Sequence, residues 1–414
     1  MKPVYLFVIV LYIMITLFSC QGRQEKISSD IEKTPTMQTG SRQPMPDEWI
    51  DQDTGHRIIR LSRRKKGGSS FYFHNNPFLK GLDGEGDLMV FYGEVDSLRQ
   101  LFSLNLKNLE IIQLTFHGHQ IRGEIVSPVT REAYYQSHDS IFATHVDSKL
   151  TRLVYVFPED FKAGITTINA NGTLLAGSYA SQEKRDIYEK HPEKRDYFTL
   201  IFEARILHIL FTINIETGEL KKIYSERAWL NHIQFSPTDP DILMYCHEGP
   251  WHLLDRIWTI NINTGINKLM HERTMDMEIA GHEFFSRDGK TIWYDLQQPR
   301  GKTFYLAGVR IESGQQIKYA MTSDEWSIHF NISPDQTIFA GDGGDSTQVA
   351  HAVDGRWIYL FTPQGDSLAA SKLVNMKHHS YRPLEPNVHF SPDGKFVIFR
   401  SDLDGDTHIY AVEI

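Results

Sequence analysis

The stretch Phe390-Ser391-Pro392-Asp393-Gly394, followed by Phe396-Val397-Ile398-Phe399, decides the fold because it belongs to a repeat. Pro presets φ, Asp bonds the local backbone and Gly accepts a positive φ, so the first five residues predict a tight turn before a strand. The same layout recurs at Phe235-Ser236-Pro237-Thr238-Asp239, Phe285-Ser286-Arg287-Asp288-Gly289 and Ile332-Ser333-Pro334-Asp335. Successive serines lie 50, 47 and 58 positions apart, a period typical of propeller blades.

A second repeated piece is an alternating strand followed by a Thr-Gly turn, at residues 211–218 and 257–265. Weaker copies of the repeat occur at residues 83–91, 140–156 and 171–176. We therefore predict an all-β, seven-bladed β-propeller. Its last blade runs out of chain after residues 409–412, so we expect a strand at residues 56–61 to close it, which pairs open edges. The charged segment 181–196 predicts a helical insertion in the third blade.

The N-terminus has the layout of a bacterial lipoprotein signal. Lys2 precedes an apolar run at residues 4–18, and Ser19 precedes Cys20. We expect residues 1–19 to be a signal peptide, Cys20 to carry diacylglycerol and residues 20–46 to be a polar tether. The β-propeller domain would span residues 47–414, lipid-anchored to the cell envelope on its periplasmic face or at the cell surface. The alternative is one N-terminal membrane helix with an incidental cysteine.

Composition excludes several classes of protein. The net charge is −9 with dispersed acidic residues, which argues against a nucleic-acid partner because such a partner requires a basic face. If Cys20 is lipidated, Cys246 is the one remaining cysteine, so neither a disulfide framework nor a cysteine-based zinc site is possible. The fold must be stabilised by its core.

Departures from the repeat mark candidate sites. Residues 245–256 crowd two His, a Glu and a Trp between two strands, as a functional cluster or as a hydrogen-bonded corner. Residues 71–78 include His74 and Asn75, which suit sugar binding but also fit an ordinary strand start. One histidine recurs directly before or within the start of each repeat turn, as an axial cluster or as a structural residue: His232, His282, His329 and His389.

Several motifs together resemble the oligogalacturonate lyase family from about residue 49 to the C-terminus. They are Trp49-Ile50-Asp51, Tyr72-Phe73-His74-Asn75, Cys246-His247-Glu248-Gly249-Pro250-Trp251-His252, Gly281-His282-Glu283-Phe284 and Leu384-Glu385-Pro386-Asn387. The resemblance implies β-elimination on short oligogalacturonates, which are pectin fragments. A base removes the C5 proton of an acidic sugar, and a cation or guanidinium offsets the charge of the sugar's carboxylate. The C4–O bond then breaks, which gives a 4,5-unsaturated uronate.

The resemblance also implies roles for individual residues. His247 would be the base, since a neutral imidazole suits that task. Arg227, or alternatively Lys222, would neutralise the carboxylate. Expected substrate-binding residues are His74, Asn75, Trp251, His252 and Arg382. The family's metal site takes His282 plus a Gln and two His, where this chain has Arg382, Glu385 and Asn387. We expect His282, Glu385 and Asn387 to hold a divalent metal such as Mn²⁺.

A second hypothesis is a non-catalytic envelope propeller that binds glycans or protein partners, as TolB-like propellers do. Generic repeats and the altered metal set favour it. Convergence of His247, His282 and an arginine in one pocket would favour the lyase, whereas scattering of these residues would favour the binding protein.

Overall fold

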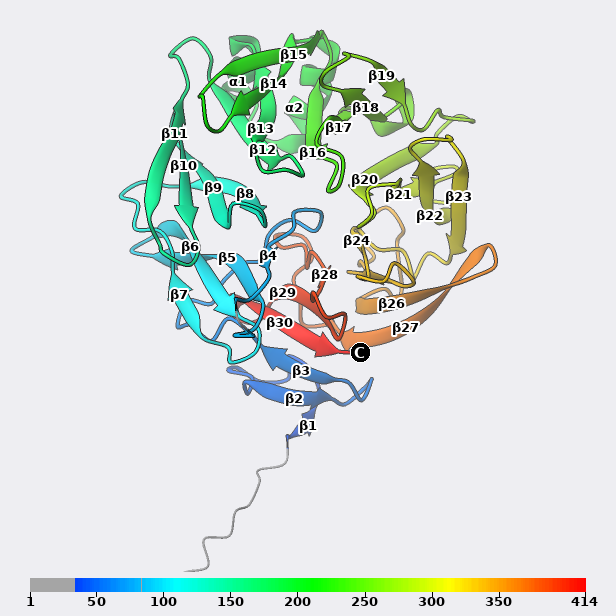
Figure 1. The fold of residues 1–414 in the computed structure, drawn as a ribbon. Coiled ribbons are helices and arrows are strands. Elements are labelled where there is room, and N and C mark those ends of the chain that lie inside the picture. The colour runs from blue at the N-terminus through cyan, green and yellow to red at the C-terminus, as the bar shows by residue number, and fades with distance from the viewer. Residues whose placement is uncertain (1–33, 83) are drawn as a thin grey trace, which may run out of the picture. The chain divides into compact units, whose positions relative to one another are not determined.

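The fold is seen in a computed structural model that describes residues 34–82 and 84–414; Cys20 and the predicted signal peptide lie outside them. Residues 35–414 form one unit, in which successive antiparallel sheets are arranged around a centre (Figure 1). In this part of the chain, no helix is long and apolar enough to cross a bilayer.

Four four-stranded sheets form the first four blades. The first is β4 (Phe78–Leu79), β5 (Leu88–Val95), β6 (Leu98–Asn105) and β7 (Ile111–Gln113). The second is β8 (Arg122–Ser127), β9 (Glu132–Ser137), β10 (Ser140–His145) and β11 (Thr151–Val156). The third is β12 (Ala163–Ile168), β13 (Leu174–Ala180), β14 (His208–Asn214) and β15 (Leu220–Glu226). The fourth is β16 (Leu230–Phe235), β17 (Ile242–His247), β18 (Ile257–Asn261) and β19 (Asn267–Leu269).

The fifth and sixth blades share one eight-stranded sheet because a single bridge, Ala320 to Ser367, joins their outermost strands. The fifth is β20 (Ile279–Phe285), β21 (Thr291–Gln297), β22 (Phe304–Arg310) and β23 (Gln316–Met321). The sixth is β24 (Phe330–Ile332), β25 (Phe339–Gly341), β26 (Trp357–Gln364) and β27 (Ser367–Asn375).

The seventh blade confirms the predicted closure. It contains β28 (His389–Phe390), β29 (Phe396–Asp404), β30 (Asp406–Glu413) and, from the other end of the chain, β3 (Arg57–Arg60). β3 pairs antiparallel with β30, with Ile58 opposite Val412. The prediction of a seven-bladed propeller closed by an N-terminal strand is therefore confirmed.

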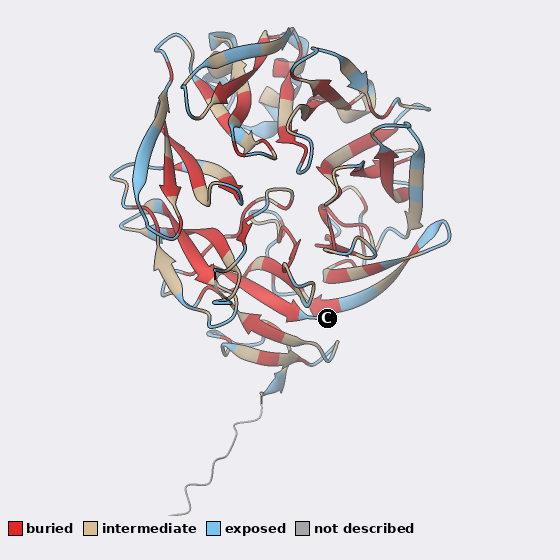
Figure 2. Cartoon of the chain, in the orientation of Figure 1, coloured by how far each residue is buried: buried red, intermediate tan, exposed pale blue. Residues whose placement is uncertain are grey.

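The repeated turn forms through its serine. Ser391 Oγ donates to Asp393 and accepts the backbone N–H of Phe396 at 3.0 Å, while Gly394 adopts φ +73°. Apolar residues of neighbouring blades pack into shared cores between the sheets. The buried residues lie on the inner strands, and the outermost strands are more exposed (Figure 2).

The predicted tether proves too long. β1 (Thr36–Met37) pairs parallel with β2 (Glu48–Asp51), which in turn pairs with β3. Thr39 bonds both the Asp51 carboxylate and the Trp49 indole, and Met45 is 2% exposed in the core. These buried contacts, which composition does not reveal, place residues 35–46 in the propeller and not in the tether.

The predicted insertion lies between β13 and β14 of the third blade. It forms α1 (Gln182–Lys190) and α2 (Lys194–Glu203) and thus extends past residue 196. Ile201 of α2 is buried against Ile206 and Trp229, which anchors the helices to the blade. A third short element, η1 (Trp251–Leu253), follows β17 in the fourth blade.

Candidate active site

Two cavities open among the innermost strands of the blades. The first, which we call the helix-side cavity, has a volume of about 600 Å³ and takes residues from the starts of β16 and β20 and from the helical insertion. The second, the turn-side cavity, has a volume of about 450 Å³ and takes residues from the ends of those two strands and from the turns after them. Tyr72 lines the first, whereas Phe73 and His74 line the second, so this short segment lies between the cavities.

Two matching irregularities turn histidines into the helix-side cavity. The register of β16 shifts between Asn231 and Gln234, and that of β20 shifts between Gly281 and Phe284. His232 and His282 lie inside these bulges with φ of +46° and +53°. A bulge redirects a side chain, and a positive φ is uncommon outside glycine. Equivalent bulges thus present His232 and His282 to the same cavity.

A buried cluster of polar groups surrounds His232. Arg256 is 4% exposed; its Nε lies 2.9 Å from Glu283 Oε2 and its Nη1 lies 3.0 Å from Glu248 Oε1. The Trp251 indole also donates to Glu248, and the other Glu248 oxygen lies 3.6 Å from His232 Nε2. Glu248 and Glu283 are held in place beside the His232 imidazole, because their hydrogen bonds to Arg256 are buried.

These contacts set the protonation states. Burial would raise the pKa of Glu248, but Arg256, His232 and the Trp251 indole outweigh it and lower that pKa to about 2. Burial lowers the pKa of His232, and Arg256 adds to the lowering while Glu283 and Glu248 oppose it. His232 is therefore neutral at pH 7, with a lone pair available to accept a proton.

A second histidine system borders the same cavity. His329 Nδ1 lies 2.8 Å from Asp342 Oδ2, and His329 Nε2 lies 3.1 Å from the Tyr72 hydroxyl. Burial lowers the pKa of His329 well below its usual value and raises the pKa of Asp342 to about 7. Burial also raises the pKa of Tyr72, so its phenol keeps its proton. A protonated phenol backed by an imidazole can act as a proton donor.

The helical insertion and η1 form an aromatic wall over this cavity. Tyr188 contacts Tyr197 at a ring distance of 4.7 Å, and Phe198 contacts Trp251 at 5.7 Å. Exposed cations, Lys194 and Arg300, also line the cavity. An aromatic surface with positive charge beside it suits an acidic sugar chain, because rings pack on the wall while carboxylates meet the cations.

The structure does not bring His247 to this cavity. Its Nε2 lies 3.1 Å from Glu226, and its ring stacks on Trp258 at 5.3 Å. Side chains alternate along a strand, so His247 at the end of β17 faces away from its neighbours Cys246 and Glu248. The two proposed carboxylate-neutralising residues are also remote: Arg227 is exposed and bonds the Arg205 carbonyl, and Lys222 lies over Phe161.

The predicted substrate-binding residues are divided. Trp251 lines the helix-side cavity, whereas His74 and Asn75 line the turn-side cavity. His252 lines neither; its carbonyl accepts a bond from Arg273. Arg382 is exposed and lines neither cavity.

The predicted metal ligands separate as well. His282 and Glu385 both line the helix-side cavity, and His282 Nδ1 is buried without a hydrogen-bond partner in the described part of the chain. Asn387 is fully buried; its amide oxygen accepts the N–H of Phe73 and its amide nitrogen donates to the Glu385 carbonyl. Across residues 34–82 and 84–414, no group of three His, Cys, Asp or Glu side chains is arranged to hold a metal. Two of the three predicted ligands thus line one cavity, and Asn387 does not.

His232, His282, His329 and His389 all lie just before the turns of the repeat, and the first three lie close together in the structure. His329 packs edge-on against His282 at a ring distance of 5.0 Å. His389 instead bonds the Asn387 and Asn75 carbonyls and lines the turn-side cavity. Arg256 and Glu283 lie within segments singled out from the sequence, residues 245–256 and 281–284, but their ion pair was not predicted.

Comparisons with known proteins agree in sequence and in fold. A sequence model of the family described as Oligogalacturonate lyase matches residues 43–414. An oligogalacturonide lyase of Pectobacterium atrosepticum is 26% identical over 389 residues, covering 88% of this chain and 95% of that protein. An oligogalacturonate lyase of Dickeya dadantii is 25% identical with the same coverage. A solved oligogalacturonate lyase in complex with manganese has a TM-score of 0.75 at 22% identity, covering 89% of this chain and 96% of that one.

Proposed function

Because the chain belongs to the oligogalacturonate lyase family, we propose that it cleaves short oligogalacturonates by β-elimination in the helix-side cavity. The observation that carries this proposal is the convergence of His232, His282 and Arg256 in one cavity with an aromatic wall. Of the three residues whose convergence was expected to favour the lyase, His282 and an arginine, Arg256, share this cavity and His247 does not. The family match favours the lyase over a non-catalytic binding propeller.

We assign the base to His232. It is neutral at pH 7 and partly exposed to the cavity, with a side-chain exposure of 20%. In the reaction, His232 would take the C5 proton of the acidic sugar. The C5–H electron pair then forms the C4–C5 double bond as the C4–O bond breaks, and the Tyr72 phenol can supply the proton that the leaving oxygen needs.

The developing negative charge on the substrate carboxylate needs a cation. Arg256 already neutralises two carboxylates, so we assign this task to the exposed Arg300 and Lys194. A guanidinium can bind a carboxylate through two parallel bonds, which stabilises charge where it appears in the transition state.

We also propose that a divalent cation, Mn²⁺ as in the solved relative, contributes to the site. His282 and Glu385 are the residues that would hold it, because the His282 Nδ1 lacks a partner and Glu385 offers a carboxylate in the same cavity. When bound, such an ion would act as a Lewis acid on a substrate oxygen. Water and substrate oxygens would complete its coordination.

The direct test is turnover of digalacturonate and trigalacturonate followed through the ultraviolet absorbance of the 4,5-unsaturated product. We expect a rise in absorbance with both acidic oligomers and none with the matched neutral galactose oligomers. The absence of product from every acidic oligomer, with and without Mn²⁺, would refute the proposal.

We further propose that Cys20 anchors the protein to the cell envelope through lipid, with residues 20–34 as the tether. The support is the signal layout in the sequence. In a Cys20→Ser variant, the protein should leave the membrane fraction. A variant that stays fully membrane-bound would instead indicate a retained N-terminal membrane helix.

A further inference from the structure

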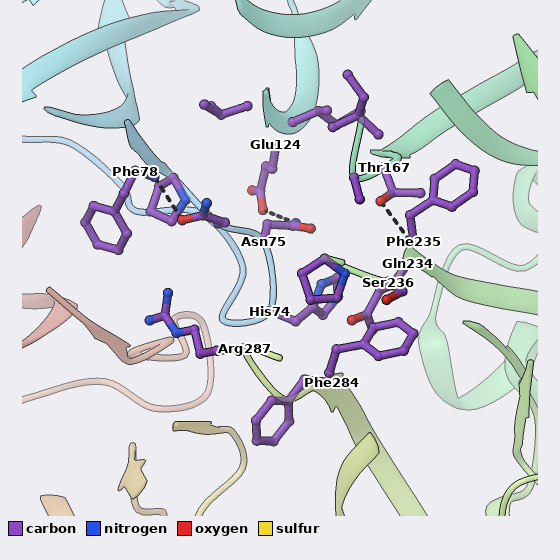
Figure 3. A pocket seen from close by; sticks show the side chains of 18 of the residues that line it. His74, Asn75, Phe78, Glu124, Thr167, Gln234, Phe235, Ser236, Phe284 and Arg287 are labelled. Atoms are coloured by element: carbon purple, nitrogen blue, oxygen red, sulfur yellow. Dashed lines mark hydrogen bonds between the residues drawn. The ribbon is translucent and has the colours of Figure 1, made fainter. Parts of the chain in front are cut away.

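The turn-side cavity is not used by the proposed reaction, and one departure from the repeat points to it. Three of the four turns carry Pro after their serine, at Pro237, Pro334 and Pro392, but the fifth blade carries Arg287. Arg287 lines the turn-side cavity and is partly buried. Its side chain reaches toward the side of the cavity that Phe78 and Asn75 form (Figure 3).

Arg287 has no partner for its charge. Within residues 34–82 and 84–414, no carboxylate lies within salt-bridge distance of its guanidinium, and its side chain makes no hydrogen bond to protein. Burial lowers the pKa of Arg287, yet a guanidinium remains charged at pH 7. A partly buried charge without a protein partner is less well solvated than one at the surface, so an anion in the cavity would pair with it favourably.

The cavity offers a second unsatisfied group. His74 Nδ1 is buried and lacks a hydrogen-bond partner in the described part of the chain. Burial lowers the pKa of His74 to about 3 and that of His389 to about 4, so both imidazoles are neutral at pH 7. They therefore add hydrogen-bonding atoms without adding charge.

Glu124 faces Arg287 from the opposite side of the cavity (Figure 3). One of its oxygens accepts the Tyr72 N–H and the Asn75 amide at 3.1 Å, and its other oxygen makes no hydrogen bond within the described part of the chain. The cavity thus carries a positive group and a hydrogen-bond acceptor at different places. An anion would bind beside Arg287, and hydroxyl donors would bind beside Glu124. Phe78 and Phe284 add apolar residues to the lining of the cavity.

We propose that the turn-side cavity is a second binding site, which takes an acidic sugar of one or two rings with its carboxylate on Arg287 and its hydroxyls toward Glu124. The volume of about 450 Å³ admits such a ligand. Bidentate pairing with a carboxylate is the geometry that a guanidinium favours. The identity of the sugar as a uronate rests on the proposed function, whereas the anion site rests on Arg287 and His74 alone.

The test compares binding of galacturonate, galactose and inorganic phosphate to the full chain by calorimetric titration and by the shift of the thermal midpoint. The variants are Arg287→Gln and, as a control with the same change of charge, Lys290→Gln, whose side chain is exposed on the same turn. We expect Arg287→Gln to lose at least tenfold in galacturonate affinity at this site. Lys290→Gln should keep the affinity of the unsubstituted protein, and lyase turnover should be unchanged in both variants. Arg287→Lys should retain part of the affinity, because it keeps a point charge but not the fork.

Folding of Arg287→Gln is checked by its midpoint without ligand, which should equal or exceed that of the unsubstituted protein. Galacturonate binding that is equal in both proteins would overturn the inference while leaving the lyase proposal intact. Arg287-dependent binding of phosphate without any binding of galacturonate would overturn the assignment to an acidic sugar. A protein that binds galacturonate through Arg287 but lacks lyase activity would support the site and refute the proposed function.

Discussion

Replacing Arg256 with Ala should destabilise the protein by about 3–5 kcal/mol at pH 7, the usual cost of removing one partner from a buried ion pair. The magnitude follows from burial: the side chains of Glu283 and Glu248 are 0% and 7% exposed, and Arg256 bonds both at 2.9–3.0 Å. Without the guanidinium, two buried carboxylates lose the cation that bonds them both. A surface pair makes the control, because Lys66→Ala removes the partner of Glu94, the two side chains are 56% and 48% exposed, and the free energy of unfolding should fall much less.

The unfolding free energy lost in Arg256→Ala should depend on pH in a defined direction. In the intact protein the pKa of Glu248 is depressed to about 2, so its stabilisation is present above pH 4.5 and disappears as the pH falls toward 2. The variant lacks this stabilisation, so the difference between the two proteins should be largest at neutral pH and shrink below pH 4.5. Urea unfolding at pH 7, 5 and 4 measures it, and adding Glu283→Gln should restore part of the loss. A cost below about 1 kcal/mol at pH 7, or one that does not change with pH, would refute the reasoning.

Three further predictions concern closure, buried histidines and metal. Ile58→Ala should cost about 2–5 kcal/mol in urea unfolding, because Ile58 is fully buried where the chain ends join; a cost under 1 kcal/mol would contradict its role. The folded-state pKa values of His74 and His389, about 3 and about 4, lie below the unfolded value of about 6.5. The stability that these two groups contribute should therefore be full above about pH 6.5 and fall as the pH drops from about 6.5 to about 3. His74→Phe should reduce that slope in unfolding experiments, and an unchanged slope would argue against a buried neutral His74. Lyase activity lost on chelation should return with Mn²⁺ in the intact protein but not in His282→Ala, and equal recovery in both would exclude His282 as a ligand.

The fold could be predicted from the sequence because the repeat encodes it locally. Each turn of the repeat closes hydrogen bonds through its own serine, as Ser391 does with Asp393 and Phe396. The closing strand was predictable because the last blade lacked a fourth strand. The structured residues 35–46 were not, because they depend on Thr39 bonding Asp51 and Trp49, contacts that polar composition conceals.

The site was predictable in part. The common phase of His232, His282 and His329 left an axial cluster and structural histidines as alternatives, and the side-chain contacts that decide between them are not encoded in the repeat. The assignment of the base to His247 rested on the resemblance of residues 246–252 to the family, and a motif does not say which face of a strand a residue occupies. The two-residue period of β17 sets His247 beside Glu226 and turns Glu248 toward Arg256.

The most direct test of the lyase site is the turnover of trigalacturonate by His232→Ala beside His247→Ala, with product absorbance as the readout. Loss of a general base typically costs about 10²–10⁴-fold in rate. We predict a loss of that size for His232→Ala and a rate within about threefold of the intact protein for His247→Ala. The reverse result, with His247→Ala inactive and His232→Ala active, would contradict the assignment of the helix-side cavity as the active site.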